Sequence, residues 1–103
     1  MGSAGGSRII TATIQALHHV LDRGLSARAA LAAPRLHDQL VPALTSFEWA
    51  YDNATVAYVR ALGRNVTWVA PGQSTAQGVR RSGNGTFEAA GEPRQVNSGG
   101  FAV

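Results

Sequence analysis

The chain has 103 residues, of which 45% are hydrophobic and 15% charged, and nine arginines without a lysine give it a net charge of +3. This length and balance are typical of one small globular domain or part of a larger one, and the lack of cysteine excludes disulfides and thiol nucleophiles. The arginines are scattered rather than gathered in a stripe, which argues against nucleic-acid binding, and no stretch reaches the ~18–20 apolar residues of a membrane span.

The first predicted element is an amphipathic helix over residues 8–23. Gly5-Gly6-Ser7 precedes it, and Arg23-Gly24 ends it with a cation in the last turn and a glycine after the last residue. Its predicted apolar face combines residues at three- and four-residue spacing: Ile9, Ile10, Thr13, Ile14, Leu17, Val20 and Leu21.

Short elements follow in the middle of the chain. Ser26 is expected to cap a helix over 27–32, and Pro34 to end it. The further expectations are an irregular connection over 34–39, a strand over 44–49, a helix capped by Asp52 or Asn53 and ended by Gly63, and a strand over 65–70. The helix after Asp52 is expected to bury Val56, Ala57, Val59, Ala61 and Leu62. The strand over 44–49 is expected to place Leu44, Ser46 and Glu48 on one side and Phe47 and Trp49 on the other.

The last part of the chain predicts a β-hairpin. Strands over 74–80 and 86–90 flank Asn84-Gly85, a pair that favours a type I′ turn because both central residues then need positive φ. Residues 95–100 are expected to be a mobile tail. The order of elements predicts an α+β fold with helices packed on one face of a mainly antiparallel sheet.

The stretch from Gly5 to Ser7 is the candidate functional site. Glycines adopt positive φ and let a bound group approach the backbone, and the first amides of a helix have no internal partner. The helix dipole also makes this end positive. The pattern therefore suits an anion, or an oxygen that becomes one, although glycines at this position more often serve only as a loop and cap.

Three segments resemble one family at matching spacing: residues 5–13 (GGSRIITAT), 33–39 (APRLHDQ) and 91–94 (GEPR). Over nearly its whole length the chain resembles the C-terminal half of the small subunit of gamma-glutamyltranspeptidase, also called glutathione hydrolase. The resemblance implies that residues 1–103 are a single partial domain, part of the αββα sandwich of N-terminal nucleophile hydrolases.

The resemblance also implies a role for Gly5 and Gly6. In the family the matching glycines donate backbone N–H groups to the carbonyl oxygen of the gamma-glutamyl group as it gains charge, which makes them oxyanion-hole donors. The implied reaction is acyl transfer from glutathione to an N-terminal threonine, which self-cleavage of a precursor exposes and which needs no metal or cofactor. The implied partners are the gamma-glutamyl substrate and the large subunit of the same precursor.

The family's remaining catalytic residues have no counterpart in this sequence. The threonine, the paired serines and the residues that hold the glutamyl α-carboxylate and α-amino group lie upstream of the glycine pair in the family, whereas Met1 stands four residues before Gly5. Ala4 also replaces a proline that many members have. The chain is thus expected to be a C-terminal fragment without the nucleophile, inactive alone; the alternative is a non-catalytic remnant that binds a partner.

Three of the four asparagines lie in N-x-Ser/Thr sequons, at Asn53, Asn65 and Asn84, which chance gives in about 1% of cases at this Ser and Thr content. They are candidate glycosylation sites and suggest a parent protein that is secreted, at the cell surface or vacuolar. The sequence itself contains no signal peptide pattern.

Other candidate sites are weaker. His18 and His19 point ~100° apart on a helix and cannot face one metal ion, so no metal site is expected. A triad of Ser7, His37 and Asp38 lacks a nucleophile elbow and is rejected. A phosphate-binding loop would need a preceding strand and a lysine, which the sequence does not predict. Arg35 is expected to tie a loop through a salt bridge or carbonyl contacts.

Overall fold

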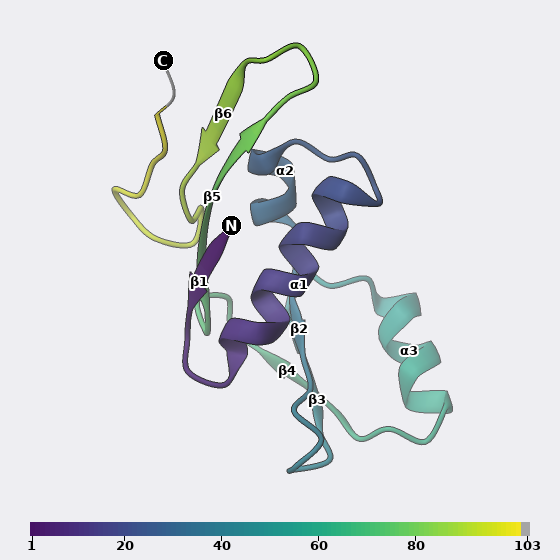
Figure 1. Cartoon of the computed structure of the whole chain (residues 1–103). Helices are drawn as coiled ribbons and strands as arrows, with labels where there is room; N and C mark the ends of the chain where they lie inside the picture. The colour runs from purple at the N-terminus through teal and green to yellow at the C-terminus, as the bar shows by residue number, and fades with distance from the viewer. Residues whose placement is uncertain (102–103) are drawn as a thin grey trace.

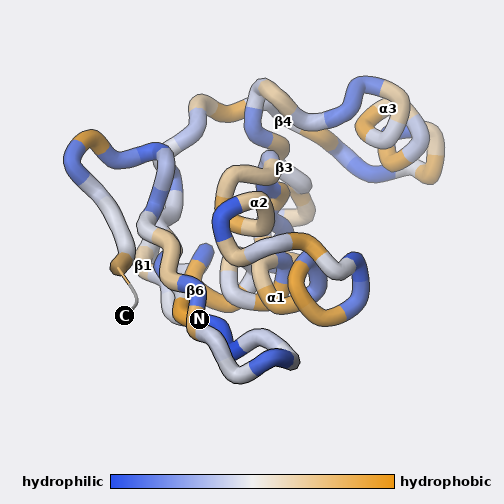
Figure 2. Tube along the Cα trace, turned by 90° about the horizontal axis from the view of Figure 1, so that it is seen from above, coloured by the Kyte–Doolittle hydropathy of each residue, from blue (hydrophilic) through white to orange (hydrophobic). Residues whose placement is uncertain are grey.

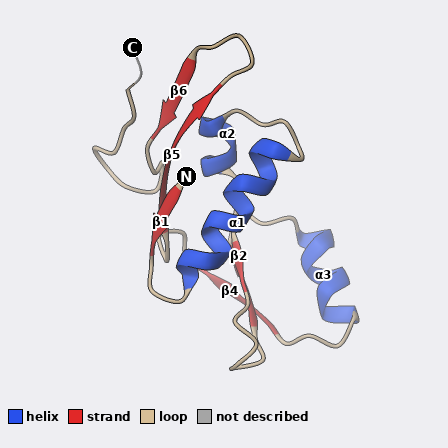
Figure 3. Cartoon of the chain, in the orientation of Figure 1, coloured by secondary structure: helices blue, strands red, loops and turns tan. Residues whose placement is uncertain are grey.

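The computed structural model describes residues 1–101 and contains two three-stranded sheets and three helices (Figure 1; Figure 3). The elements are β1 (Gly2–Ala4), α1 (Arg8–Leu21), α2 (Ala27–Ala32), β2 (Leu36–His37), β3 (Thr45–Glu48), α3 (Asn53–Ala61), β4 (Val66–Val69), β5 (Thr75–Arg81) and β6 (Phe87–Ala90). The predicted α+β class is confirmed. Each helix in the described part of the chain is too short to span a lipid bilayer.

The first sheet has the strand order β1-β5-β6, and both of its pairings are antiparallel. Helices α1 and α2 cover one of its faces, and a small core forms between them. Leu31 is fully buried there, and the rest of that core consists of alanines: Ala16, Ala27, Ala76 and Ala90. Because alanine has a short side chain, the helices approach the sheet closely.

The second sheet has the order β2-β3-β4. β3 pairs antiparallel with β2 but parallel with β4, and α3 forms the crossover between the two parallel strands. All four residues of β3 are buried, and Phe47 packs edge-on against Tyr51 at 4.9 Å between ring centroids. β3 lies within the predicted strand over 44–49, and its burial along the whole length shows that both of its faces are covered.

Capping follows the sequence signals. Ser26 Oγ accepts a hydrogen bond from Ala29 N at 3.1 Å, and Asp52 Oδ2 accepts one from Thr55 N at 2.9 Å, which begins α3. Gly24 follows α1 with φ 69°. These caps satisfy amides that a helix leaves without partners and so fix where each helix begins.

Three local expectations were wrong. β1 was not predicted, and β2 lies inside the connection that was expected to be irregular; both are two or three residues long and form by pairing with distant strands. The hairpin is present, but only Gly85 of the Asn84-Gly85 pair has positive φ, and Gly85 N bonds to Ser82 O, so the turn is not type I′. Residues 95–100 contain no helix or strand, and the segment passes close to β6, where a Cβ on Gly100 would meet Ala90 N at 2.6 Å.

The two longer helices bury less apolar surface than their patterns predict. In α1 the buried residues are Ala12, Ala16 and Val20, while Ile10, Ile14 and Leu21 are exposed. In α3, which lies to one side of the other elements in Figure 1 and contacts β4, Val56 alone is buried. Figure 2 shows hydrophobic segments along both helices.

Candidate functional site

The loop between β1 and α1 carries Gly5 and Gly6. Ala4 pairs with Thr75 of β5, and the chain then reverses through Gly5 at φ 135° and Gly6 at φ 60° into α1 (Figure 1). The carbonyls of Gly5 and Gly6 accept hydrogen bonds from Arg8 N at 3.1 Å and Ile9 N at 3.2 Å, which joins the loop to the first turn of the helix. Both glycines are exposed.

The backbone amides of this loop are free of internal acceptors. Within residues 1–101, no backbone or side-chain oxygen accepts a hydrogen bond from Gly5 N or Gly6 N. Both amides precede a helix of fourteen residues, whose dipole places partial positive charge at this end. Two exposed donors in such a field can bind a carbonyl oxygen that gains negative charge.

The two glycines are required for different reasons. A Cβ on Gly5 would lie 2.9 Å from Gln73 O and 3.1 Å from Ser74 Cα, both backbone atoms, so the position excludes a side chain by packing. A Cβ on Gly6 would meet nothing within 4 Å. Packing inside the described chain therefore accounts for Gly5 but not for Gly6, where only the backbone angle favours glycine.

The wall behind Gly5 is held by Arg35. Its Nη1 atom donates to Ser74 O at 3.1 Å and to Glu92 Oε2 at 2.7 Å. The same carboxylate oxygen of Glu92 accepts the amide of Ala76 in β5 at 2.7 Å. Arg35 also donates to Leu31 O at 3.0 Å, so this buried side chain joins α2, β5 and the segment after β6. The expectation that Arg35 ties a loop through an ion pair and carbonyl contacts is confirmed.

Arg94 extends the same network. It donates to both carboxylate oxygens of Glu48, at 2.8 and 2.6 Å, and to Glu92 Oε1 at 3.0 Å, and its other two hydrogens bond to the carbonyls of Leu31 and Ala33. Burial by itself would raise the pKa of Glu92, but the hydrogen bonds from the two arginines and from backbone amides outweigh it and hold that pKa below its usual value. The carboxylates likewise raise the pKa of Arg94 against the effect of burial.

The rejected triad is not assembled. His37 Nδ1 shares a hydrogen bond with Thr11 Oγ1 at 2.7 Å, and its Nε2 lies 3.0 Å from Gln39 Oε1. Asp38 instead accepts from Thr45 Oγ1 at 2.6 Å and pairs with Arg64. The Thr45 hydroxyl is the main reason that the pKa of Asp38 falls to about 2. No group of His, Asp and Glu suited to a metal ion occurs among residues 1–101.

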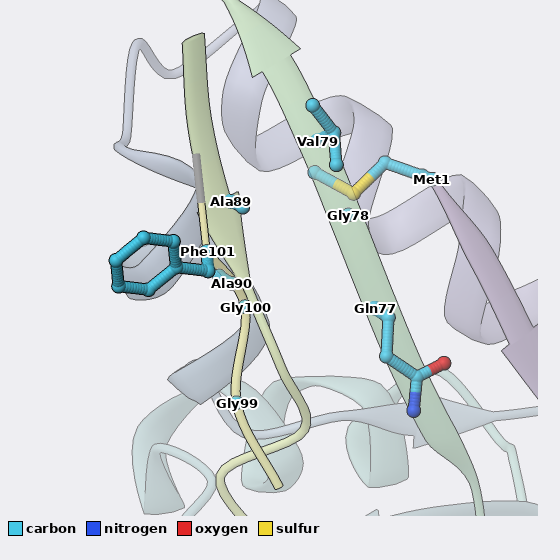
Figure 4. Close-up of a pocket in the computed structure, with 9 residues that line it drawn as sticks. All are labelled: Met1, Gln77, Gly78, Val79, Ala89, Ala90, Gly99, Gly100 and Phe101. Atoms are coloured by element: carbon cyan, nitrogen blue, oxygen red, sulfur yellow. The ribbon is translucent and has the colours of Figure 1, made fainter. Parts of the chain in front are cut away.

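An open groove of about 430 Å³ lies elsewhere, along β5 and the tail (Figure 4). Met1 crosses β5 at Gly78, where a Cβ would overlap the methionine sulfur. The other lining residues are Gln77, Val79, Ala89, Ala90, Gly99, Gly100 and Phe101. None of these side chains titrates, so the groove offers no acid, base or nucleophile.

Reasoning from sequence alone missed the pairing of Arg35 and Arg94 with Glu48 and Glu92. A signal was available, since these acids interrupt otherwise apolar segments and charged residues are rarely buried unless paired. Their partners were not predictable, because Arg35 and Glu92 are 57 residues apart.

Comparisons with known proteins agree on one family. The family model described as Gamma-glutamyltranspeptidase matches residues 1–102. The glutathione hydrolase proenzyme of Arthroderma benhamiae is 50% identical over 102 residues, and the glutathione hydrolase of Aspergillus flavus is 46% identical over 102. The Escherichia coli proenzyme is 32% identical over 96 residues.

Solved structures give the same result. The gamma-glutamyltranspeptidase of Pseudomonas nitroreducens, complexed with L-DON, matches 99% of this chain at 30% identity with a TM-score of 0.83. The T380A mutant from Helicobacter pylori matches 91% at 28% identity with a TM-score of 0.77. The chain spans 17% of the length of the two fungal relatives and 53% of the Pseudomonas chain.

Proposed function

Because the chain belongs to the gamma-glutamyltranspeptidase family and has its N-terminal nucleophile hydrolase fold, we propose that it forms the C-terminal part of a glutathione hydrolase. In this proposal residues 1–103 are one partial domain that supplies the oxyanion hole. The threonine nucleophile and the groups that hold the glutamyl moiety belong to polypeptide outside this sequence. The partners are then the large subunit of the same precursor and a gamma-glutamyl substrate, and the parent enzyme is secreted, at the cell surface or vacuolar.

The observation that carries the proposal is the state of the Gly5 and Gly6 amides. Both are exposed, neither donates to an acceptor within residues 1–101, and both precede the N-terminus of α1. Amides committed to internal carbonyls could not stabilise an oxyanion, because each N–H makes one strong hydrogen bond.

The chemistry follows from this placement. The threonine hydroxyl attacks the gamma-glutamyl carbonyl carbon, and a C–O bond forms while the carbonyl oxygen gains negative charge between the two amides. The amide C–N bond then breaks, and the hydroxyl proton is transferred to the departing amine of cysteinylglycine. Water hydrolyses the gamma-glutamyl ester, or the amine of an amino acid or dipeptide takes over the acyl group.

A chimeric proenzyme tests the proposal. Residues 1–103 replace the matching region of the Arthroderma benhamiae proenzyme, which is 50% identical over this stretch. We expect the chimera to cleave itself into two subunits and to release p-nitroaniline from gamma-glutamyl-p-nitroanilide. We expect the isolated chain to show no release. A soluble, folded chimera that neither cleaves nor turns over would favour the alternative of a non-catalytic remnant.

A further inference from the structure

We propose that Asn53, Asn65 and Asn84 each carry an N-linked oligosaccharide. The proposal rests on the proposed function only for the secretory route, and its test does not measure glutathione hydrolysis. Each asparagine has threonine two residues later and a residue other than proline between them. All three are exposed in the folded chain, so a bulky sugar can be attached without disturbing the core.

Asn84 has the acceptor atom available. It lies in the turn between β5 and β6, and its Oδ1 accepts hydrogen bonds from Thr86 N at 3.1 Å and Thr86 Oγ1 at 2.6 Å. These bonds use the oxygen of the side-chain amide, and its nitrogen, Nδ2, donates to no acceptor within residues 1–101. The sugar is attached to that nitrogen, so the turn holds the sequon with its reactive atom free.

Asn53 begins α3 and Asn65 follows it, and this helix lies to one side of the other elements (Figure 1). Asn53 is the first residue of α3, whose cap is Asp52, so its own side chain is not needed for capping. Asn65 is held through its backbone, since its carbonyl accepts Thr45 N at 2.9 Å. Neither side chain hydrogen-bonds to another described residue.

The distribution of sequons agrees with the proposed site. Residues 1–52 contain no asparagine, and they include the Gly5-Gly6 loop and the exposed isoleucines of α1. Glycans at the three positions would therefore be attached outside the half of the sequence that contains the loop proposed to bind substrate. The two relatives that are 46–50% identical are fungal, and eukaryotic secretory pathways contain the transferase that reads sequons.

The reaction is a glycosyl transfer without redox change. Asn Nδ2 attacks C1 of an oligosaccharide linked to a polyprenyl pyrophosphate. The N–C1 bond forms, the bond from C1 to the pyrophosphate oxygen breaks, and the amide loses one proton. The transferase supplies the lipid-linked donor.

The test directs the full chain into the yeast secretory pathway behind a signal peptide. Whole-cell lysate and medium are both analysed, so poor secretion does not hide the result. Digestion with peptide N-glycosidase F in H₂¹⁸O converts each glycosylated asparagine to ¹⁸O-labelled aspartate, which peptide mass spectrometry detects. We expect label at positions 53, 65 and 84. Asn97 is an internal control, because it is exposed but has glycine two residues later.

Matched variants test glycosylation at each of the three asparagines separately. Thr55→Val, Thr67→Val and Thr86→Val remove one sequon each and keep the asparagine, whereas Thr→Ser at the same positions keeps the sequon. We expect each Val variant to lose one glycan by gel mobility and the Ser variants to retain it. If an asparagine stays unlabelled in both the wild-type chain and its Thr→Ser variant, that asparagine is not glycosylated. If all three stay unlabelled, the proposal is wrong.

Discussion

The guanidinium of Arg35 and the carboxylate of Glu92 meet at 2.7 Å although the residues are 57 positions apart, and both side chains are buried. Through Ser74 and Ala76, this ion pair fixes the backbone against which Gly5 packs. The geometry of the glycine loop thus depends on a contact between the middle of the chain and its last segment.

Removing the charge of Glu92 tests this dependence. Glu92→Gln leaves Arg35 without its ionic partner in a buried site, and breaking such a pair costs about 3–5 kcal/mol. We expect guanidinium unfolding of the chimeric proenzyme to show a loss of this size. Asp22→Asn is the control, because its pair with His18 is exposed and worth about 1 kcal/mol or less. Equal effects of the two substitutions would mean that the buried pair does not stabilise the fold.

The exposed isoleucines of α1 predict self-association of the isolated chain. Ile10 is 67% exposed and Ile14 59%, and an uncovered apolar face promotes aggregation. We expect the wild-type chain to aggregate and the double variant Ile10→Gln/Ile14→Gln to remain monomeric in size-exclusion chromatography with light scattering. In contrast, Ala16→Gln places a polar amide in the core, so that chain should lose its helical circular dichroism. An unaltered elution profile of the double variant would show that another surface drives aggregation.

The low pKa of Asp38 predicts that the stability of the fold decreases at acidic pH. Its folded-state pKa of about 2 lies below the usual 3.8, so its ionised carboxylate stabilises the fold above about pH 4. This contribution is lost as the pH falls toward 2. Thr45→Val removes the hydroxyl that contributes most to the shift, and we expect the pKa to move toward 3.8.

Carboxyl ¹³C NMR titration of the soluble double variant measures this pKa. Thr67→Val in the neighbouring strand β4 is the control, since Thr67 does not bond to Asp38. A pKa that stays near 2 in Thr45→Val would assign the shift to the Leu40 amide and Arg64 instead.

The substitution Gly5→Ala is expected to disturb the loop between β1 and α1. The added Cβ would lie 2.9 Å from Gln73 O at a backbone angle that side chains rarely adopt, a strain of about 1–3 kcal/mol. We expect faster hydrogen–deuterium exchange of peptides covering β1 in the chimeric proenzyme. Gly2→Ala is the matched control, because a Cβ there meets nothing within 4 Å. Identical exchange in both variants would contradict the proposed packing of Gly5.

The sequence predicts elements whose signals are local. Ser26 and Asp52 cap helices as expected, and the hairpin around Gly85 forms because its turn residues suit a reversal. β1 and β2 were missed because they have two or three residues each and exist only through pairing with β5 and β3. No local pattern of hydrophobicity encodes a strand that short.

The buried face of α1 could not be read from periodicity. The largest apolar residues suggest that the isoleucines face the core, but the structure buries Ala12 and Ala16 and leaves Ile10 and Ile14 exposed. A hydrophobic pattern identifies apolar sides of a helix without saying which neighbour covers each one. The glycine loop, by contrast, was singled out from sequence, because glycines before a helix are a local signal and match the motif of the family. Its contact with Gln73 and Ser74, which excludes a side chain at Gly5, could not be predicted from that local signal.

Gly6 provides the most direct test of the central proposal. Gly6 at φ 60° and Gly24 at φ 69° both have open space where a Cβ would be, so alanine should cost each position a similar ~1–2 kcal/mol of backbone strain. The measurement is kcat for gamma-glutamyl-p-nitroanilide in the chimeric proenzyme. We predict that Gly6→Ala lowers kcat about 10²-fold, because the added Cβ would occupy the open space beside the amide and displace the reacting carbonyl from its donors, while Gly24→Ala leaves kcat unchanged. Equal kcat values in the two variants would contradict a role for Gly6 at the reacting carbonyl.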